Sequence, residues 1–265
     1  MKPKTQELLY FFLWACDKLC RPTWRSIDES FEQWAYRNGL QRQINVLEKQ
    51  KLLERNGTEH KASARLLRLT QQGRIEALGG RDPEACWNRV WDGQWRLVLF
   101  DVPVKDDSVR DRLRKYLRHR GFGYLQRSVW VTPHALNEEK AILSAQDVDV
   151  ASLLFLEARP CAGETDEEIV REGWNFQEIN RLYNKVLEVL EDRPVAKLRT
   201  DTNAREFRTW ANQERSAWLA AVTKDPLLPK SLHPEGYLGA KAWHTRIKVL
   251  RQAAEQIKDF TSTEK

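Results

Sequence analysis

The chain has 265 residues, 41% of them hydrophobic, so it can bury cores and exceeds the usual size of a single domain. No run of about 18 apolar residues occurs, and the start of the chain carries charges where a secretion signal needs an apolar segment. The sequence therefore predicts a cytoplasmic protein of two or three domains, without a membrane span. Its four cysteines lack histidines or a second cysteine pair at metal-ligand spacing, which predicts reduced thiols and no metal centre.

The positive charge is concentrated at the N-terminal end. The formal net charge is +6, and residues 1–80 carry 14 Lys or Arg against 9 Asp or Glu. Residues 81–160 carry 13 against 12, and the remainder carries 17 against 17. Such an asymmetry indicates a module that faces nucleic acid. An ordinary solvated surface would give the same imbalance, so the patterning of the chain has to decide.

Residues 1–80 have the pattern of a winged helix-turn-helix domain. Apolar residues at helical spacing predict a helix over residues 5–20 and a second helix after the capping box of Ser26 and Glu29. A turn precedes a third helix, whose inward positions are Leu40, Ile44 and Leu47. Two short apolar stretches, residues 52–55 and 65–70, flank a polar segment and predict a β-hairpin, the wing.

The third helix and the hairpin carry the predicted DNA contacts. Gln, Arg and Asn can pair with base edges in a major groove, whereas Lys suits phosphates. We expect Arg42 to read a guanine. The predicted DNA-binding residues are Gln41, Arg42, Asn45, Lys49, His60, Lys61 and Arg65. The alternative is a solvated polar face, but helix pattern, hairpin and charge split together favour DNA binding.

Residues 81–160 have the element order of a ferredoxin-like domain, βαββαβ. The predicted elements are a strand over residues 95–102, a helix over 108–121, two strands within 124–131, a helix over 137–145 and a strand over 151–158. Such a sheet leaves one face free of its own helices. We expect that face to pack against a second copy or another domain, which predicts a homodimer.

Two features of this central region carry unusual charge. Asp101 ends the first predicted strand and could hold a metal ion, but one carboxylate is not a metal site, so we expect a structural role. The helix over residues 108–121 is rich in arginine. We expect it to hold domains or partners together rather than DNA.

Residues 161–265 predict an all-helical domain for effector sensing and dimerisation. One predicted helix begins after Asn175, which forms a cap with Glu178. A second predicted helix spans residues 204–223, and a third ends the chain. Four tryptophans, Trp174, Trp210, Trp218 and Trp243, either line an apolar pocket or belong to the core, and the core is the more common role. Candidate cations for an anionic ligand are Lys230, His233, Lys241 and Arg246.

The block WDGQWRLVLFDVP, followed by RDRLRKYLRHRGFGYLQRSVWVTP, resembles the PaaX family of repressors of phenylacetic-acid degradation. The resemblance continues in RLLRLTQQGR, in a Trp174 that opens a helix, and in TKDPLLPKSLHPEGY. It implies a homodimeric regulator that binds double-stranded operator DNA and is released by an acyl-coenzyme A effector. Gln41 stands where the family pattern has Arg, so the operator is expected to differ.

The resemblance also leaves an alternative open, because the central domain is similar to the ferredoxin-fold nuclease subunit of CRISPR adaptation. There, an Asp at the position matching Asp101 is linked to metal-dependent cleavage. Three functions are therefore weighed: a repressor that is not an enzyme and needs no cofactor, a metal-dependent nuclease, and a ligand-independent nucleic-acid-binding component of a defence system. The charge split and the winged-helix pattern favour DNA binding, and the resemblance to the PaaX family implies that the DNA-binding protein is a repressor.

Overall fold

The computed structural model describes residues 41–56, 66–70, 72–73, 81–100, 107–126, 128–136, 153–196 and 201–262. The chain divides into two compact units. The first unit consists of residues 1–82, 184–219 and 240–265, and the second of residues 83–183 and 220–239. The division into domains of residues 1–80, 81–160 and 161–265 stays a prediction.

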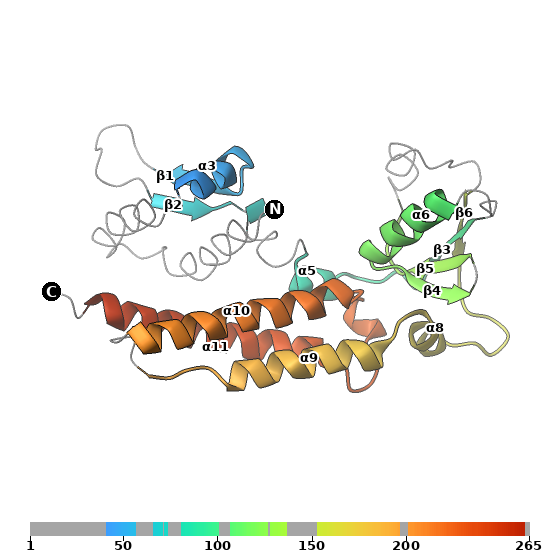
Figure 1. Ribbon diagram of the computed structural model, residues 1–265. Helices are drawn as coiled ribbons and strands as arrows, with labels where there is room; N and C mark the ends of the chain where they lie inside the picture. Colours follow the sequence, from blue (N-terminus) through green and yellow to red (C-terminus); the bar gives the residue numbers. More distant parts are fainter. Residues whose placement is uncertain are drawn as a thin grey trace. The chain divides into compact units, whose positions relative to one another are not determined.

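The second unit contains a four-stranded antiparallel sheet with the strand order β4-β5-β3-β6 (Figure 1). Its elements are β3 (Trp95–Phe100), α6 (Asp107–His119), β4 (Gly123–Gln126), β5 (Val129–Thr132) and β6 (Leu153–Ala158). This is the strand order of a ferredoxin-like sheet, and the predicted division of residues 124–131 into two strands is confirmed. The predicted helix over residues 137–145 lies outside the described residues.

Helix α6 covers one face of this sheet. Val98 and Phe100 point to that face from β3, in alternation with Leu97 and Leu99, and pack against Leu113 of α6. The complete cluster of buried residues is Val98, Phe100, Leu113, Leu117, Phe122, Trp130 and Leu153. The apolar run of β3 is therefore explained by burial on both faces of the sheet.

Helix α6 ends in the way the sequence predicts. Gly121 has a φ of +82°, the left-handed conformation that glycine adopts without steric cost. The amide of Phe122 donates to the carbonyl of Leu117 at 3.0 Å, and the amide of Gly121 donates to that of Arg118 at 3.0 Å. This pair of bonds satisfies carbonyls that the helix end would otherwise leave open.

The second face of the sheet is partly covered by α8 (Asp166–Gly173) and the short 3-10 helix η3 (Lys230–Leu232). The buried residues on this side are Trp95, Val131, Val170, Trp174, Leu228 and Leu232. Gly123 allows the ring of Trp174 to lie close to β4, because a Cβ at this position would be 2.8 Å from Cε2 of Trp174. At the other edge of the same face, Leu154 and Leu156 of β6 stay exposed, by 53% and 42%.

Helix α8 was missed from the sequence although its start carries a clear signal. The hydroxyl of Thr165 accepts from the amide of Glu168 at 3.2 Å, and the Glu168 carboxylate accepts from the amide of Thr165 at 2.9 Å. This is a capping box, T-x-x-E, of the kind used to predict other helices here. Trp174, expected to open a helix, caps the C-terminus of α8 and stands two residues before the next helix begins at Phe176.

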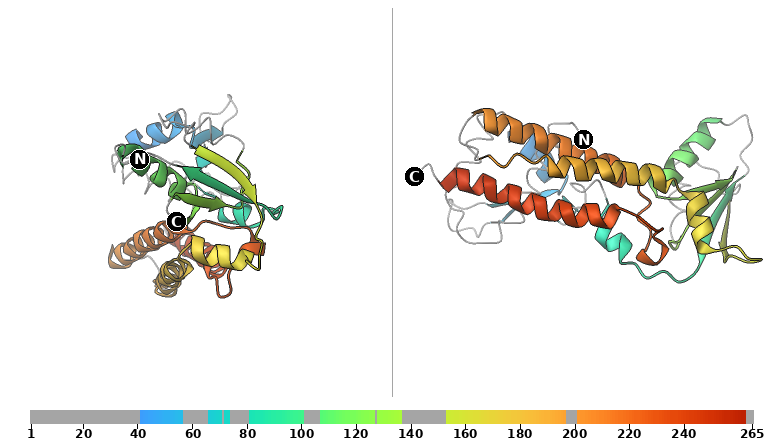
Figure 2. Two further views of the ribbon diagram at one scale, coloured as in Figure 1. Left: turned by 90° about the vertical axis from the view of Figure 1, so that its right-hand side faces the viewer. Right: turned by 90° about the horizontal axis from the view of Figure 1, so that it is seen from below.

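Three long helices follow: α9 (Phe176–Glu191), α10 (Asp201–Lys224) and α11 (Gly239–Ser262). Their parts in the first unit lie side by side (Figures 1 and 2). Val189, Phe207, Trp210 and Ala253 form the core between them. The predicted cap is confirmed, since the Asn175 side chain accepts from the amide of Glu178 at 3.0 Å. The helical character predicted for the C-terminal region is therefore confirmed.

The N-terminal part of the chain is described over α3 (Gln41–Lys49), β1 (Leu53–Asn56) and β2 (Leu66–Leu69). These are the predicted third helix and the two strands of the predicted wing. The predicted helix over residues 5–20 and the helix after Ser26 lie outside the described residues. Among the described helices, none combines the length and the apolar character that crossing a membrane requires.

Candidate nucleic-acid interface

The end of α3 is joined to the hairpin by a helix-terminating motif. Lys51 has a φ of +56°, and the amide of Leu52 donates to the carbonyl of Leu47 at 2.9 Å. Both leucines are buried, with exposed fractions of 6% and 0%. The amide of Lys51 also donates to the carbonyl of Glu48 at 2.9 Å, and these two bonds with a left-handed residue form the Schellman motif. It fixes the direction in which the chain leaves α3 toward β1.

The two strands form an antiparallel hairpin in which Leu53 pairs with Leu69 and Asn56 with Leu66. Thr70 closes its open end, because the Thr70 hydroxyl donates to the carbonyl of Lys51 at 2.7 Å. The amide of Thr70 also donates to the carbonyl of Leu52 at 3.1 Å. Lys51 and Leu52 are thus hydrogen-bonded both to the end of α3 and to Thr70, which follows β2. These bonds make α3 and the hairpin one local structure.

The structure places some of the predicted DNA-binding residues and leaves others untested. Asn45 and Lys49 are exposed on α3 and stand one helical turn apart, while Leu47 is buried. Gln41 and Arg42 belong to the first turn of α3. The side chains of Gln41 and Arg42, and the residues His60, Lys61 and Arg65, lie outside what the structure describes. A helix with an exposed polar face, followed by a hairpin, is suited to a DNA groove.

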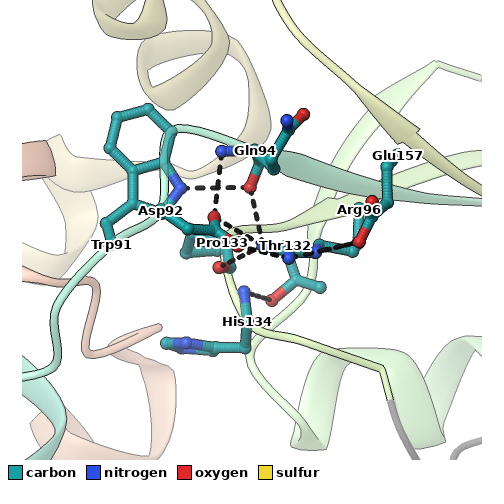
Figure 3. A network of polar contacts seen from close by, with 8 residues as sticks. All are labelled: Trp91, Asp92, Gln94, Arg96, Thr132, Pro133, His134 and Glu157. Atoms are coloured by element: carbon teal, nitrogen blue, oxygen red, sulfur yellow. Dashed lines mark hydrogen bonds and ion pairs between the residues drawn. The ribbon is translucent and has the colours of Figure 1, made fainter.

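A polar network lies at one end of the central sheet (Figure 3). The guanidinium of Arg96, only 7% exposed, donates to both carboxylate oxygens of Asp92, at 2.8 and 2.5 Å. It also donates to Glu157 at 3.2 Å and to the carbonyl of Pro133 at 3.3 Å. The hydrogen bond from Arg96 lowers the pKa of Asp92 to about 2. Arg96 thus ties β3 to β6 and to the end of β5, which is a structural task.

A metal-dependent nuclease site finds no support in the described residues. Within them, no three His, Cys, Asp or Glu side chains lie together in a way that could hold a metal ion. Asp101, the residue on which the nuclease alternative depends, lies outside the described residues. The carboxylate of Asp92 accepts hydrogen bonds from Arg96, so it is already engaged in the network.

The four candidate pocket tryptophans are all buried. Trp174 packs under the sheet, and its indole N–H donates to the carbonyl of Gly121 at 3.1 Å. Trp210 donates to the carbonyl of Val189 at 2.7 Å within the helical core. Trp218 and Trp243 contact each other, with ring centroids 5.3 Å apart. The tryptophans therefore belong to at least two separate packing regions. The core role is confirmed for Trp174, whereas Trp210 both packs in the helical core and borders a cavity.

The cations considered for an anionic ligand are also spread over the chain. Lys230 and His233 belong to the second unit, Lys241 and Arg246 to the first. Arg246 is 1% exposed and donates to the carboxylate of Glu214 at 2.5 Å, so its charge is already matched inside the helical core. His233 is half-buried and bonded to the carbonyl of Leu228 at 2.9 Å. Lys230 and Lys241 are exposed.

An open cavity of about 410 Å³ lies between the end of α9 and the first half of α10. Its lining includes Trp210 together with two carboxylates, those of Asp192 and Glu206, and the lining residues in the described part of the chain include no Lys or Arg. Carboxylates repel phosphates at short range. This cavity is therefore a poor match for the phosphates of a coenzyme A thioester.

A buried carboxylate that sequence reasoning missed lies in the second unit. Asp225, 1% exposed, accepts from the hydroxyl of Tyr183 at 2.5 Å, from the hydroxyl of Tyr237, and from the amide of Leu227 at 2.8 Å. Burial and the nearby carboxylate raise the pKa of both tyrosines, which therefore remain neutral donors. The local signal was the Asp-Pro pair, but the partner tyrosines stand too far along the chain for any spacing rule.

The geometry defines a class of protein: a chain with an N-terminal helix and hairpin, a ferredoxin-like antiparallel sheet and a set of long C-terminal helices. Residues 88–170 match the family description "PaaX protein central Cas2-like domain", and residues 174–263 match "PaaX-like protein C-terminal domain". The chain belongs to the PaaX family.

Two relatives illustrate the range of similarity. The transcriptional repressor PaaX of Escherichia coli (strain K12) is 26% identical over 208 residues, which are 74% of this chain. The match spans 61% of that repressor's own length. Protein Rv0674 from Mycobacterium tuberculosis, an uncharacterised protein, has the same fold with a TM-score of 0.52, 22% identity and 84% of each chain covered.

Proposed function

We propose that this chain is a transcriptional regulator, acting as a repressor in the cytoplasm, that reads double-stranded operator DNA with α3 and the β1–β2 hairpin. The observation that carries the proposal is the local structure around Leu52, which joins α3 to the hairpin and leaves Asn45 and Lys49 exposed. Membership of a family that includes a repressor supports the same function. Repression would follow from steric competition at the operator.

Gel retardation with DNA from upstream of the chain's own transcription unit tests this proposal. Arg42→Ala should weaken binding by about 1–3 kcal/mol and relax the sequence preference, because a base-edge contact is lost. Lys61→Ala should weaken binding to all sequences alike and reduce the salt dependence. Arg171→Ala, a change at an exposed arginine of α8, is the matched control. Unchanged binding by both Arg42→Ala and Lys61→Ala would refute the helix-and-hairpin reader.

We further propose that the protein is a homodimer and that the exposed end of the sheet face takes part in the contact. Leu154 and Leu156 lie on β6, which has one neighbour among the described strands, and both are largely exposed. An apolar edge strand left open is prone to pair with another chain, so native proteins usually cover it. A palindromic operator also needs two readers related by symmetry.

Light scattering coupled to size exclusion tests the dimer surface. The double change Leu154→Glu with Leu156→Glu should yield a monomer, because two carboxylates would be buried in the contact. Val90→Glu is the control, since Val90 is 96% exposed in the same unit and its replacement adds a carboxylate outside the sheet. A double variant that remains dimeric would place the contact on another surface.

The last part of the proposal concerns the effector that releases the regulator from DNA. We propose an acyl-CoA-like ligand that shifts the dimer to a spacing that no longer fits one helical turn of DNA. A thermal-shift panel of acyl-CoA thioesters tests it, because a ligand that binds only the folded state raises the melting temperature. Silence across the panel would favour a ligand-independent nucleic-acid-binding component.

DNA cleavage with magnesium or manganese that is lost in Asp101→Asn would contradict the proposal that the chain is not an enzyme.

A further inference from the structure

Helix α6 presents a row of positive charge to solvent. Its inward residues Leu113 and Leu117 are buried in the core of the sheet, and the opposite side is exposed. We define the α6 basic stripe by the exposed basic residues on that side, Arg112, Lys115, Arg118 and His119. Residues 110–120 carry six Lys or Arg against one Asp, whereas the rest of residues 81–160 carries seven against eleven. The stripe is thus a local concentration of charge in an otherwise acidic region.

Asp111 is the one acidic residue within residues 110–120, and its ion pair is with Arg114 rather than with a residue of the stripe. Arg112 and Lys115 stand three residues apart, as do Lys115 and Arg118, and like charges at this spacing destabilise a helix. Among the described residues, no carboxylate lies within ion-pair distance of Arg112 or Lys115, and the ion pair shown on α6 joins Arg114 to Asp111 at 3.9 Å. Arg118 lies 5.7 Å from the ring centroid of Trp130, whereas the charges of Arg112 and Lys115 are not offset by an ion pair among the described residues.

Helices α8 and α9 treat their exposed cations differently. Their cations each form an ion pair with an acid three residues away: Arg171 with Glu168, Arg181 with Glu178, and Lys185 with Glu188. The helix dipole explains cations only in the last turn, which on α6 holds Arg118 and His119. Arg112 and Lys115 lie in the middle of α6, so neither the dipole nor pairing accounts for them.

The chemistry of the stripe favours phosphates over an acidic protein. Protein interfaces are built on exposed apolar and aromatic anchors and are depleted in Lys. Among the described residues, the exposed large apolar side chains are Val90, Tyr124, Leu154, Leu156 and Val195, and none lies on α6. Arg112 to Arg118 spans about 9 Å along the helix axis, enough for two or three phosphates at about 3.4 Å of rise each.

We propose that the α6 basic stripe is a second DNA-contacting surface, which binds the phosphate backbone without reading bases. The inference rests on the proposed DNA-binding function and adds a contact in the second unit, remote in sequence from α3. It replaces the expectation that this helix serves protein contacts. The stripe contributes affinity and salt dependence, while α3 and the hairpin supply the sequence preference.

The test measures binding of the full chain to a mixed-sequence DNA duplex as a function of salt. Each phosphate contact adds about 0.9 to the slope of log K against log salt concentration. Arg112→Ala with Lys115→Ala should reduce the slope by about 1 to 2 and weaken binding at low salt. Arg171→Ala with Lys185→Ala removes the same charge from exposed sites and should leave the slope unchanged. If the alanine variant is unstable, Arg112→Gln with Lys115→Gln replaces it.

The outcomes separate the two proposals. A slope in the α6 double variant equal to that of the unmodified chain, together with a slope reduced by Lys61→Ala, overturns the inference and leaves the helix-and-hairpin reader intact. An unmodified chain that binds no DNA overturns both. An α6 double variant with an unchanged slope that no longer binds poly-glutamate would assign the stripe to an acidic protein instead.

Discussion

Two buried carboxylates, one in each unit of the molecule, are neutralised in different ways. Glu214, 0% exposed, accepts from the guanidinium of Arg246 at 2.5 Å, and that guanidinium also lies 4.5 Å from the ring centroid of Trp218. Asp225 accepts from two tyrosine hydroxyls and from a backbone amide. The first carboxylate is matched by a formal charge, the second by neutral donors.

The difference predicts how each region responds to substitution. A buried ion pair depends on both partners, because removal of one leaves a charge in a medium that solvates it poorly. A carboxylate held by several neutral donors loses only part of its stabilisation when one donor is removed. The helical core should therefore be the more sensitive region, and the Asp225 cluster the more tolerant one.

The largest effect is expected from Arg246→Met. It leaves the Glu214 carboxylate buried without this guanidinium, which should lower the free energy of unfolding by about 3–5 kcal/mol. Urea unfolding of the variant measures the loss. The double variant Glu214→Gln with Arg246→Met removes both charges and should recover most of it. A single variant as stable as the unmodified chain would show that the pair contributes little.

A smaller effect is expected from Asp225→Asn. Both tyrosine hydroxyls donate to Oδ2 of Asp225, and the Leu227 amide donates to Oδ1. The asparagine amide keeps one acceptor oxygen and turns its NH₂ group toward the donors of the other, so the loss should be about 1–3 kcal/mol. The same urea experiment measures it, with Asp192→Asn as the control at an exposed carboxylate. A loss larger than that of Arg246→Met would reverse the comparison between the two regions.

Tyr237→Phe should have a still smaller effect. It removes one hydroxyl donor to Asp225 and keeps the ring contacts with Trp87 and His233, whose centroids lie at 6.2 and 4.5 Å. The remaining donors still hold the carboxylate, so the expected loss is about 0.5–1.5 kcal/mol. If the loss equals that of Asp225→Asn, Tyr237 is the dominant donor and the cluster is less tolerant than proposed.

The smallest effect concerns pH and His233, which lies beside the Asp225 cluster. Burial lowers the pKa of His233 from its ordinary 6.5. As the pH falls through 6.5, the unfolded chain gains a proton before the folded chain does, so stability falls below that pH and is unaffected above it. His233→Gln should show a flatter dependence of the urea midpoint on pH in this window. An identical dependence would assign the effect to other groups.

The sequence predicted those parts of the fold that depend on local rules. Apolar spacing located α6, the strands around it and the long C-terminal helices, and the cap at Asn175 and the C-cap at Gly121 were both confirmed. It missed α8, although Thr165 and Glu168 carry the capping box, because the acidic stretch after them has few apolar residues. Local patterns are therefore reliable only where the apolar face of an element is well developed.

In the candidate site, too, some features followed from the local sequence and others only from the tertiary structure. The order of a polar-faced helix and a hairpin followed from residues 40–70 alone, since periodicity and turns are properties of neighbouring residues. The exposure of the α6 basic stripe and of Leu154 depended on which faces of the sheet other segments cover. The pairs Glu214–Arg246 and Tyr183–Asp225, 32 and 42 residues apart, came only from the tertiary structure. Burial of a charge is decided by packing between distant segments, and no spacing along the chain encodes it.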